Sequence, residues 1–509
     1  MPALQARRPA AERSWSDLFS GPASALEQVS QHGPRKTAEE VFMLRKLIAV
    51  LVVVAFVLPV PASGLAADDV RIRQLEEKLL EMQKELEALK ADQVKEKEEA
   101  KREQEEASRK TNVIAETVDQ LRTQLTIPED LELEGEYGMG PAASKVYRQQ
   151  HGLSIGGYGE ASFTSYVNDR NPGDSNVGDF ERLVLYTGYK FNDWIVLNAE
   201  VEFEHGGTAS SESASSGEVE LEFAYLDFFL NEHANVRTGL VLVPMGFLNE
   251  WHEPVFYYSV NRPEVERQII PTTWRELGVG VFGEVTPGLD YRMFLLNSMN
   301  AKGIRPEGVR DARQSGNRAL FEDVAFVVRA DYTPTPTLLF ASSVFTGDTG
   351  QDQVVDDIAI PTTSTTIWEV HAQYRAYGLQ ARALFTMANL GSARSLTLAL
   401  RQLGEISEDA TIAGRMIGSY LELAYDVMPW LLPDSQMALA PFARYSYLNT
   451  QDETPPGLGS NSNLDQQIWE VGLDYRPIQN VVFKMDYRTF NVVSGSQPDE
   501  FNLGFGFVF

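Results

Sequence analysis

The sequence predicts an all-β transmembrane barrel of 16 antiparallel strands, preceded by an α-helical coiled coil. Three observations lead to this prediction. From residue 151 onward, apolar and polar residues alternate with the period of a β-strand, as in Ala-Glu-Val-Glu-Phe-Glu at 199–204. The connections between such runs alternate between long and short. The last residues end on aromatic side chains that would share one face of a strand.

The alternating pattern forms 16 separate runs between residues 151 and 509. They span 153–166, 179–191, 194–205, 217–231, 235–243, 275–286, 288–298, 322–333, 336–347, 366–376, 379–389, 415–428, 437–449, 466–477, 480–491 and 499–509. Long loops at one end and short turns at the other are typical of an outer-membrane barrel. Lipid requires closure, because an open sheet edge would leave backbone groups without hydrogen-bond partners. The alternative, a soluble array of β-sandwiches, would not require this rhythm.

The final strand resembles the signal that is read by the barrel-insertion machinery. Asn502, Gly504, Phe507 and Phe509 fill its pattern of a polar residue, a glycine two positions later, and aromatics at the antepenultimate and last positions. The resemblance implies that the insertion machinery and outer-membrane lipid are partners of the chain. With an even number of strands, the N-terminal and C-terminal ends of the barrel segment both lie on the periplasmic side.

The first 67 residues predict a leader. Residues 43–67 have the features of a signal peptide: Arg45 and Lys46, an apolar run at 47–58, and small residues up to Ala67. A membrane anchor is the alternative, but 12 apolar residues are too few to span ~30 Å of hydrocarbon. Residues 1–42 form a polar N-terminal extension upstream of a second candidate start at Met43.

Residues 68–127 predict a coiled coil in the periplasm. Apolar residues recur at alternating spacings of three and four, which is the seam of a left-handed coiled coil. They are Ile72, Leu75, Leu79, Met82, Leu86 and Leu89. An isolated helix cannot bury such a seam, so self-association is expected, with a solvated single helix as the alternative. Residues 128–150, with Pro128, Gly138, Gly140 and Pro141, are expected to be a linker.

Five short segments of the predicted barrel resemble the phosphate-selective porin O and P family. They are Gly-Gly-Tyr-Gly at 156–159, Phe-Glu-Arg at 180–182, Ala-Tyr-Leu-Asp at 224–227, Val-Arg-Thr-Gly at 236–239 and Pro-Met-Gly-Phe at 244–247. The resemblance implies a trimeric, sixteen-stranded channel over roughly residues 150–509. Phosphate selectivity in that family depends on basic residues lining the channel. This barrel has only Lys190, Lys302 and Lys484 as lysines, so no phosphate site can be transferred residue by residue.

The long connection 244–274 is the candidate constriction loop. Its charged residues stand beside aromatic ones, and a structured lining of this kind would filter solutes by size and charge. The candidate pore-lining residues are Glu250, Glu253, Arg262, Glu264, Glu266, Arg267 and Arg275. An ordinary loop whose charges pair with the barrel wall is the alternative.

An acidic cluster is predicted on the third and fourth strands. Antiparallel pairing would bring together Glu200, Glu202, Glu204, Glu218, Glu220 and Glu222. Like charges opposite one another are destabilising, so something must offset them. The options are arginines from 299–321 (Arg305, Arg310, Arg313, Arg318), bound Ca²⁺ or Mg²⁺, protonation, or screening in a hydrated mouth. A change of alternation near residues 224–225 indicates a β-bulge.

Six arginines within predicted strands form a candidate basic wall opposite the acidic cluster. They are Arg182, Arg292, Arg375, Arg382, Arg444 and Arg488. Arginines scattered at the membrane rims are the alternative.

Composition excludes several other classes. The net charge of −28, from 72 acidic and 44 basic residues, disfavours nucleic acid as a partner. The absence of cysteine excludes disulfides and a thiol nucleophile. Six scattered histidines show no metal-ligand spacing, and no phosphate loop or nucleophile elbow is present, so we expect no enzyme. No cofactor is indicated beyond Ca²⁺ or Mg²⁺ at the acidic cluster.

These features together predict a trimeric outer-membrane porin of a Gram-negative bacterium, a passive channel for small hydrophilic or charged solutes. The alternatives are a phosphate- or anion-selective channel, or a non-conducting anchor between the outer membrane and the periplasm.

Overall fold

A computed structural model describes residues 135–168, 170, 173–206 and 217–509, with scattered helical residues between 80 and 110. The chain divides into two compact units, Met1–Thr117 and Val118–Phe509. The N-terminal extension and the signal peptide lie outside the described residues, and so does the seam of the predicted coiled coil. None of the described helices is long and apolar enough to cross a membrane.

The second unit is a closed antiparallel barrel of 16 strands, as predicted. Its strands are β1 (Gly152–Tyr166), β2 (Val177–Asn192), β3 (Ile195–Glu204), β4 (Val219–Phe228), β5 (Asn235–Leu242), β6 (Arg275–Thr286), β7 (Leu289–Asn297), β8 (Val324–Thr335), β9 (Leu338–Asp348), β12 (Ser364–Ala376), β13 (Leu379–Leu390), β14 (Arg415–Tyr425), β15 (Ala438–Glu453), β16 (Asp465–Ile478), β17 (Val481–Val492) and β18 (Glu500–Val508). β1 pairs with β18 to close the barrel, with Tyr158 opposite Val508.

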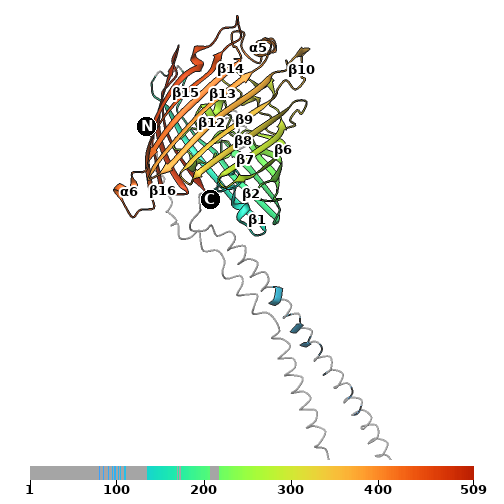
Figure 1. The fold of residues 1–509 in the computed structure, drawn as a ribbon. Coiled ribbons are helices and arrows are strands. Elements are labelled where there is room, and N and C mark those ends of the chain that lie inside the picture. The colour runs from blue at the N-terminus through green and yellow to red at the C-terminus, as the bar shows by residue number, and fades with distance from the viewer. Residues whose placement is uncertain are drawn as a thin grey trace, which may run out of the picture. The chain divides into compact units, whose positions relative to one another are not determined.

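The two ends of the barrel differ, as the loop lengths predicted. The long connections gather at the upper end in Figure 1, and the tight turns lie at the lower end with the C-terminus. Short elements occur in the connections: α3 (Lys145–Arg148), η2 (Pro254–Phe256), α4 (Val265–Gln268), η3 (Ala301–Gly303), η4 (Arg310–Ala312), β10 (Val354–Val355), β11 (Ile358–Ala359), α5 (Ala393–Gln402), α6 (Met428–Leu431) and η5 (Ser462–Leu464).

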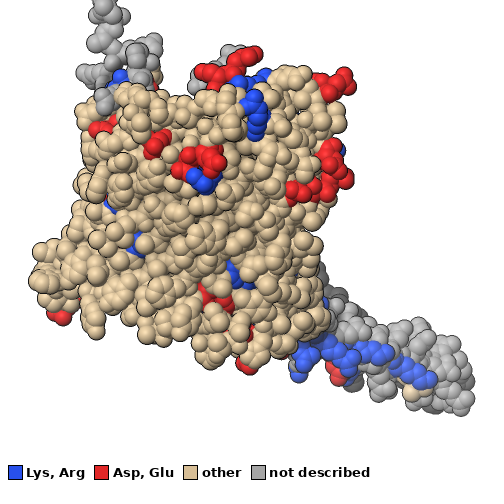
Figure 2. Space-filling model, turned by 45° about the horizontal axis from the view of Figure 1, so that its top comes forward, with Lys and Arg blue, Asp and Glu red and all other residues tan. Residues whose placement is uncertain are grey.

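The outer face of the barrel is apolar. On β6 and β7, Val279, Val281 and Leu295 are each more than a third exposed, because they point away from the interior. Aromatic side chains such as Tyr189 and Trp194 are also exposed near the turn end. Figure 2 shows that most of the side surface is uncharged and that acidic side chains gather toward the loop end. An apolar band with aromatic residues near its edge is typical of a barrel that faces lipid.

The last strand follows the alternation of the sequence. Asn502 is fully buried in the interior, where its side-chain nitrogen donates to Asp486 Oδ1 at 2.8 Å. On the opposite face, the Phe507 ring lies where a Cβ at Gly159 would be only 2.6 Å away. The predicted insertion signal therefore forms one strand with a polar inner face and an aromatic outer face.

The upper part of the barrel interior is filled by apolar side chains from the long connections. Ile304 and Val309, from the β7–β8 connection, and Ile412, from the β13–β14 connection, are fully buried. They belong to one hydrophobic cluster that also contains Trp274 and Phe345. The long connections thus fold into the barrel and form a core there.

Residues 135–150, predicted as a linker, instead lie inside the barrel. Val146 packs against β2, where a Cβ at Gly188 would lie 2.5 Å from the Val146 Cβ. The Tyr147 hydroxyl donates to Asp227 Oδ2 at 2.8 Å, and Asn198 Nδ2 donates to the Ala143 carbonyl at 2.9 Å. The small residues of this segment allow it to lie close to the wall.

Candidate functional site

Residues 243–274, between β5 and β6, fold into the barrel and are called here the inward loop. The loop lies directly against the inner wall at glycines of the strands. A Cβ at Gly506 would lie 2.5 Å from the Pro254 Cβ, and one at Gly418 would lie 2.8 Å from a methyl carbon of Val265. Because neither position has room for a side chain, these glycines allow the loop to cross the interior in contact with β14 and β18.

Asn249 fastens the two ends of the inward loop together. Its side-chain nitrogen donates to the carbonyl oxygens of Val243 at 2.6 Å and of Trp274 at 2.9 Å. Its side-chain oxygen accepts a hydrogen bond from the backbone N–H of Trp274 at 2.7 Å. Asn249 is fully buried, so these bonds do not compete with water. The loop is therefore closed at its base.

Glu266 holds the middle of the inward loop. Its Oε2 accepts hydrogen bonds from the backbone N–H groups of Phe247 at 2.8 Å and Leu248 at 2.9 Å. Its Oε1 accepts from the hydroxyl of Tyr420 on β14 at 2.5 Å. This fully buried carboxylate therefore joins two parts of the loop to the wall, which is a structural role rather than a pore-lining one.

Most of the other predicted constriction residues pair with neighbours. Glu250 Oε2 lies 2.9 Å from Arg292 on β7, and Glu264 Oε1 lies 3.3 Å from Arg488 on β17. Arg262 donates to the carbonyl oxygen of His252 at 3.3 Å. Arg267 lies 3.3 Å from Glu264 Oε1, although about half of its side chain is exposed (49%). This arrangement matches the alternative interpretation, in which the charges of the loop pair with the wall.

The pKa values of two loop carboxyls are shifted in opposite directions. Burial raises the pKa of Glu253 to about 7, although Glu253 accepts a hydrogen bond from the backbone N–H of Ala142 at 3.1 Å. Burial acts in the same direction on Glu264, but Arg267 and Arg488 outweigh it and hold the pKa of Glu264 below its usual value. Of the two carboxyl groups, that of Glu264 is therefore the more stably ionised.

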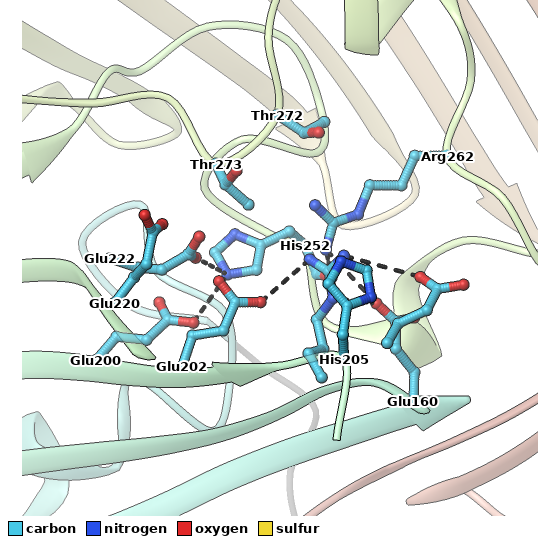
Figure 3. Close-up of polar contacts among 12 residues, drawn as sticks. Glu160, Glu200, Glu202, His205, Glu220, Glu222, His252, Arg262, Thr272 and Thr273 are labelled. Carbon is cyan, nitrogen blue, oxygen red and sulfur yellow. Dashed lines mark hydrogen bonds and ion pairs between the residues drawn. The ribbon is translucent and has the colours of Figure 1, made fainter. Parts of the chain in front are cut away.

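The acidic cluster is present at the middle of the barrel wall. Glu200 and Glu202 on β3 and Glu222 on β4 point into the interior next to the inward loop (Figure 3). All three are at most 1% exposed. Glu202 lies opposite Glu220, as predicted, but the register shifts between Glu200 and Val201, and Glu222 is the extra residue. The bulge thus lies two residues before the predicted position.

The remaining two members of the predicted acidic cluster lie at the loop end of the strands. The backbone N–H of Glu204 donates to the carbonyl oxygen of Glu218 at 2.9 Å, so the two residues face each other as predicted. Glu218 is exposed, and Glu204 is partly exposed. The cluster therefore divides into a buried set and a solvated pair.

The arginines that offset the acidic cluster are not those expected. Arg182 on β2 lies 3.4 Å from Glu202, and Arg275 on β6 lies 3.4 Å from Glu222 and also contacts Glu220. The predicted arginines have other contacts: Arg313 donates to the Thr272 carbonyl at 2.8 Å, Arg310 to the same carbonyl at 3.3 Å, and Arg305 to Glu405 at 3.2 Å. No ion pair of Arg318 is found among the described residues. The neighbouring strands, rather than the 299–321 connection, supply the positive charge.

His252 joins the acidic cluster from the inward loop. Its Nε2 lies 3.2 Å from Glu200 Oε1 and 3.5 Å from Glu222 Oε2, and the ring is only 1% exposed. Its Nδ1 lies 2.9 Å from the carbonyl oxygen of Asn249. Burial lowers the pKa of His252 below its usual value. Sequence spacing could not reveal this contact, because His252 is about 30 residues from Glu222 and reaches it only when the loop folds inward.

Three of the six predicted wall arginines, Arg382, Arg444 and Arg488, belong to a neutral row of alternating charges. One residue from each of seven neighbouring strands, β12 to β18, occupies the same row in the strand register: Gln373, Arg382, Glu422, Arg444, Glu470, Arg488 and Glu500. Arg444 donates to Glu422 at 3.0 Å and also to Glu470, and Arg488 donates to Glu500 at 2.6 Å. We call this set the alternating row. Its arginines face inward, but carboxylates stand between them.

The other predicted wall arginines lie outside this row: Arg182 pairs with Glu202 of the acidic cluster, and Arg292 and Arg375 stand on β7 and β12. Arg292 on β7 pairs with both Glu250 and Asp331. Arg375 on β12 is exposed at the turn end, and no carboxylate partner is found for it among the described residues. Arg375 is thus an exposed member of the set without a carboxylate partner among the described residues.

A cavity of about 1020 Å³ lies beneath the inward loop, at the turn end. Phe247, Leu248 and Trp251 of the loop line it on one side. Its charged lining residues are five basic ones, Lys190, Arg292, Arg329, Arg375 and Arg382, and seven acidic ones, Glu136, Asp193, Glu232, Glu250, Glu284, Asp290 and Asp331. Tyr137 and Tyr147 of the segment 135–150 narrow it further. A closed barrel with an inward loop and a charged chamber below it is the class of structure that these observations define.

Comparison with known proteins gives a relative but no function. No family model matches the sequence. A protein of Aquifex aeolicus (strain VF5), described as an uncharacterized protein, is 34% identical over 374 residues, which are 72% of this chain and 82% of that protein. The chain therefore belongs to the same family as the Aquifex aeolicus protein. The resemblance to the phosphate-selective porin O and P family stays a prediction.

Two solved structures are among those similar to this chain. Salmonella typhi OmpF in complex with daunomycin has a TM-score of 0.47 and 13% identity, over 72% of this chain and 99% of that one. The outer membrane channel DcaP of Acinetobacter baumannii has a TM-score of 0.45 and 13% identity, over 70% of this chain and 97% of that one.

Proposed function

We propose that the chain is an outer-membrane channel through which small hydrophilic or charged solutes diffuse passively. The observation that supports this most directly is the chamber of about 1020 Å³ inside a closed barrel, lined by charged side chains beneath the inward loop. A barrel that only anchored other parts of the protein would have no need of a charged, partly open chamber. Closure and the apolar outer face support an outer-membrane location.

The inner wall favours cations over anions. Among the residues linked by ion pairs around the acidic cluster, six carboxylates face three guanidiniums. The carboxylates belong to Glu160, Glu181, Glu200, Glu202, Glu220 and Glu222, and the guanidiniums to Arg182, Arg262 and Arg275. The alternating row on the other side is close to neutral. An acidic excess on one wall raises the local concentration of cations over anions inside the barrel.

The test is single-channel recording on refolded protein, with the reversal potential measured in a KCl gradient. We expect a conducting, cation-preferring pore. Replacing Glu200, Glu202, Glu204, Glu218, Glu220 and Glu222 with Gln should lower the cation preference several-fold, whereas Glu408→Gln, an exposed carboxylate of the β13–β14 connection, should leave it unchanged. An unchanged preference in the six-residue variant would place the cluster off the conduction path. A folded barrel without conductance would favour the structural anchor.

An anion-selective channel is the second candidate, and Arg375 favours it. This exposed arginine lies in the chamber together with Arg382, whose guanidinium contacts Gln373 at 2.9 Å and is 3.9 Å from Glu422. An anion-preferring pore that phosphate blocks, and that Arg375→Gln releases from block, would support this candidate.

We also propose that the channel is a homotrimer held partly by the coiled coil, because the apolar seam at 68–127 needs partner helices to be buried. Deleting residues 68–127 should weaken the trimer on unheated gels while the barrel still folds. An unchanged trimer would show that the barrel alone drives assembly.

A further inference from the structure

Three side chains from three parts of the chain meet inside the barrel wall. Glu200 comes from β3, Glu222 from β4 and His252 from the inward loop, and their ligand atoms all lie within 4.8 Å of one another (Figure 3). Each residue is at most 1% exposed. The three groups are therefore shielded from bulk water, and their charges must be balanced locally.

The hydrogen bonds of His252 determine which ring atom faces the carboxylates. The carbonyl oxygen of Asn249 can only accept, so the proton of this hydrogen bond is on Nδ1. In the neutral ring, Nε2 is then an acceptor with its lone pair directed at two carboxylate oxygens. Acceptors facing acceptors repel one another. A backbone carbonyl that fixes Nδ1–H is also the usual support of a histidine that binds metal through Nε2.

The carboxylates retain unused acceptor atoms. Glu200 Oε2, Glu202 Oε1 and Glu222 Oε2 are buried and have no hydrogen-bond donor among the residues that the structure describes. Arg182 and Arg275 approach Glu202 and Glu222, each at 3.4 Å, but no guanidinium contact is found for Glu200 in the described chain. Buried carboxylates in this condition need a cation or a bound proton to balance their charge.

We propose that Glu200, Glu222 and His252 bind a divalent transition-metal ion, which fastens the inward loop to the barrel wall. In a tetrahedral site with ligand distances of about 2.0–2.2 Å, neighbouring ligand atoms are about 3.3–3.6 Å apart. The two distances from His252 Nε2, 3.2 and 3.5 Å, are close to that edge length. Mixed imidazole and carboxylate ligands suit Zn²⁺ and its neighbours, whereas Ca²⁺ and Mg²⁺ prefer oxygen ligands alone. Three protein ligands leave a fourth position open to water or to Glu202.

The ion would connect β3 and β4 to the inward loop next to Asn249, which closes the base of the loop. The position of the loop relative to the acidic wall would then depend on the metal. This consequence concerns the folded barrel itself, so it can be tested without any measurement of transport.

The test uses the full-length mature protein, refolded in detergent, treated with chelator and then titrated with Zn²⁺. We expect one bound Zn²⁺ per chain after desalting, and a visible absorption band when Co²⁺ replaces it. His252→Ala and Glu200→Gln should weaken binding by on the order of 100-fold or more. His205→Ala is the matched control: it removes a nearby histidine that pairs with Asp179 and should bind Zn²⁺ like the wild type.

Three outcomes would overturn the proposal: no binding to the wild type, unchanged binding to the His252→Ala and Glu200→Gln variants, or displacement of Zn²⁺ by an equal concentration of Mg²⁺. Glu222→Gln, which keeps the size of the side chain, serves if His252→Ala does not refold. The Co²⁺ spectrum of the wild type needs no variant: a spectrum without an imidazole ligand would also contradict the site. Metal binding without conductance would refute the channel and leave the metal site standing.

Discussion

The alternating row and the acidic cluster are two solutions to the same problem, that of charges inside a barrel. In the alternating row, arginines and carboxylates occupy successive strands, so each charge finds its opposite in the strand register. In the acidic cluster, Glu202 lies opposite Glu220, and Glu222 stands beside Glu200. The first region is neutral by construction of the sheet, whereas the second depends on charges brought from other strands, from the inward loop, or from solution.

This difference gives the two regions different roles: the alternating row stabilises the barrel, and the acidic cluster is the candidate for function. A neutral, fully paired row inside the wall contributes rigidity and needs nothing from its surroundings. An acidic excess has a cost within the sheet, because like charges opposite one another are destabilising. A region that bears such a cost is the better candidate for interaction with mobile ions, and the following predictions test this division.

The largest effect is expected in the alternating row. Arg444→Leu would leave Glu422 and Glu470, which are 3% and 2% exposed, without their shared partner. Breaking a buried ion pair costs about 3–5 kcal/mol, so the free energy of unfolding in urea should fall by that amount. Arg375→Leu, which removes an exposed arginine of the same inner wall, should change it by less than about 0.5 kcal/mol. Equal losses in the two variants would show that the row is not a paired unit.

The outline of the barrel could be predicted from the sequence because strand alternation is a local property. Each of the 16 strands lies within a few residues of its predicted run, and the largest difference is at β15, which continues to Glu453 instead of 449. The polar residues that extend β15 belong to the loop end, where alternation no longer distinguishes a membrane-facing side chain from a solvated one. The closure of the barrel was predicted from the even number of strands and from the alternation of long and short connections.

The segments that fold inside the barrel could not be predicted from strand alternation. The position of His252 depends on the path of the inward loop, and that path depends on wall glycines such as Gly418 and Gly506, whose role appears only in three dimensions. The segment 135–150 looked like a linker because Gly138, Gly140 and Pro141 are common in linkers, yet small residues also allow close packing. Only the start of the alternating row was within reach, because the tight turn between β12 and β13 fixes the register that pairs Gln373 with Arg382, whereas both pairings of Arg444 span longer connections.

A smaller effect is expected at Glu266, which joins the inward loop to β14 near the alternating row. Glu266→Ala removes the acceptor of three hydrogen bonds, and bonds to charged groups contribute about 1.5–3 kcal/mol each at most, with partial replacement by water. We expect a loss of about 2–3 kcal/mol in the free energy of unfolding, together with larger current noise as the loop loosens. Glu266→Gln keeps an acceptor and a donor in the same place and should lose less than half as much. A quiet channel in the alanine variant would contradict the fastening role.

A loss of about 1 kcal/mol is expected where the segment 135–150 meets the wall. Tyr147→Phe removes a hydroxyl that donates to Asp227 at 2.8 Å and accepts from Arg237 at 3.2 Å. The segment should then detach more often, which faster proteolytic cleavage within 135–150 would report. Tyr137→Phe is the control, because no hydrogen bond of the Tyr137 hydroxyl is found among the described residues. Equal cleavage of the two variants would mean that packing, rather than this hydroxyl, holds the segment.

The smallest change is expected at Glu200, and its sign distinguishes the two regions. Without divalent metal, Glu200→Gln relieves a like-charge contact and should stabilise the barrel by about 0.2–1 kcal/mol, opposite in sign to the loss at Arg444. With Zn²⁺ at a hundred times its dissociation constant, the wild type should gain about 2.7 kcal/mol that the variant lacks, so the order of stability reverses. Urea unfolding with and without Zn²⁺ measures both quantities. A destabilised variant in the absence of metal would mean that Glu200 is already neutralised within the protein, and that the acidic cluster, like the alternating row, is balanced by its own residues.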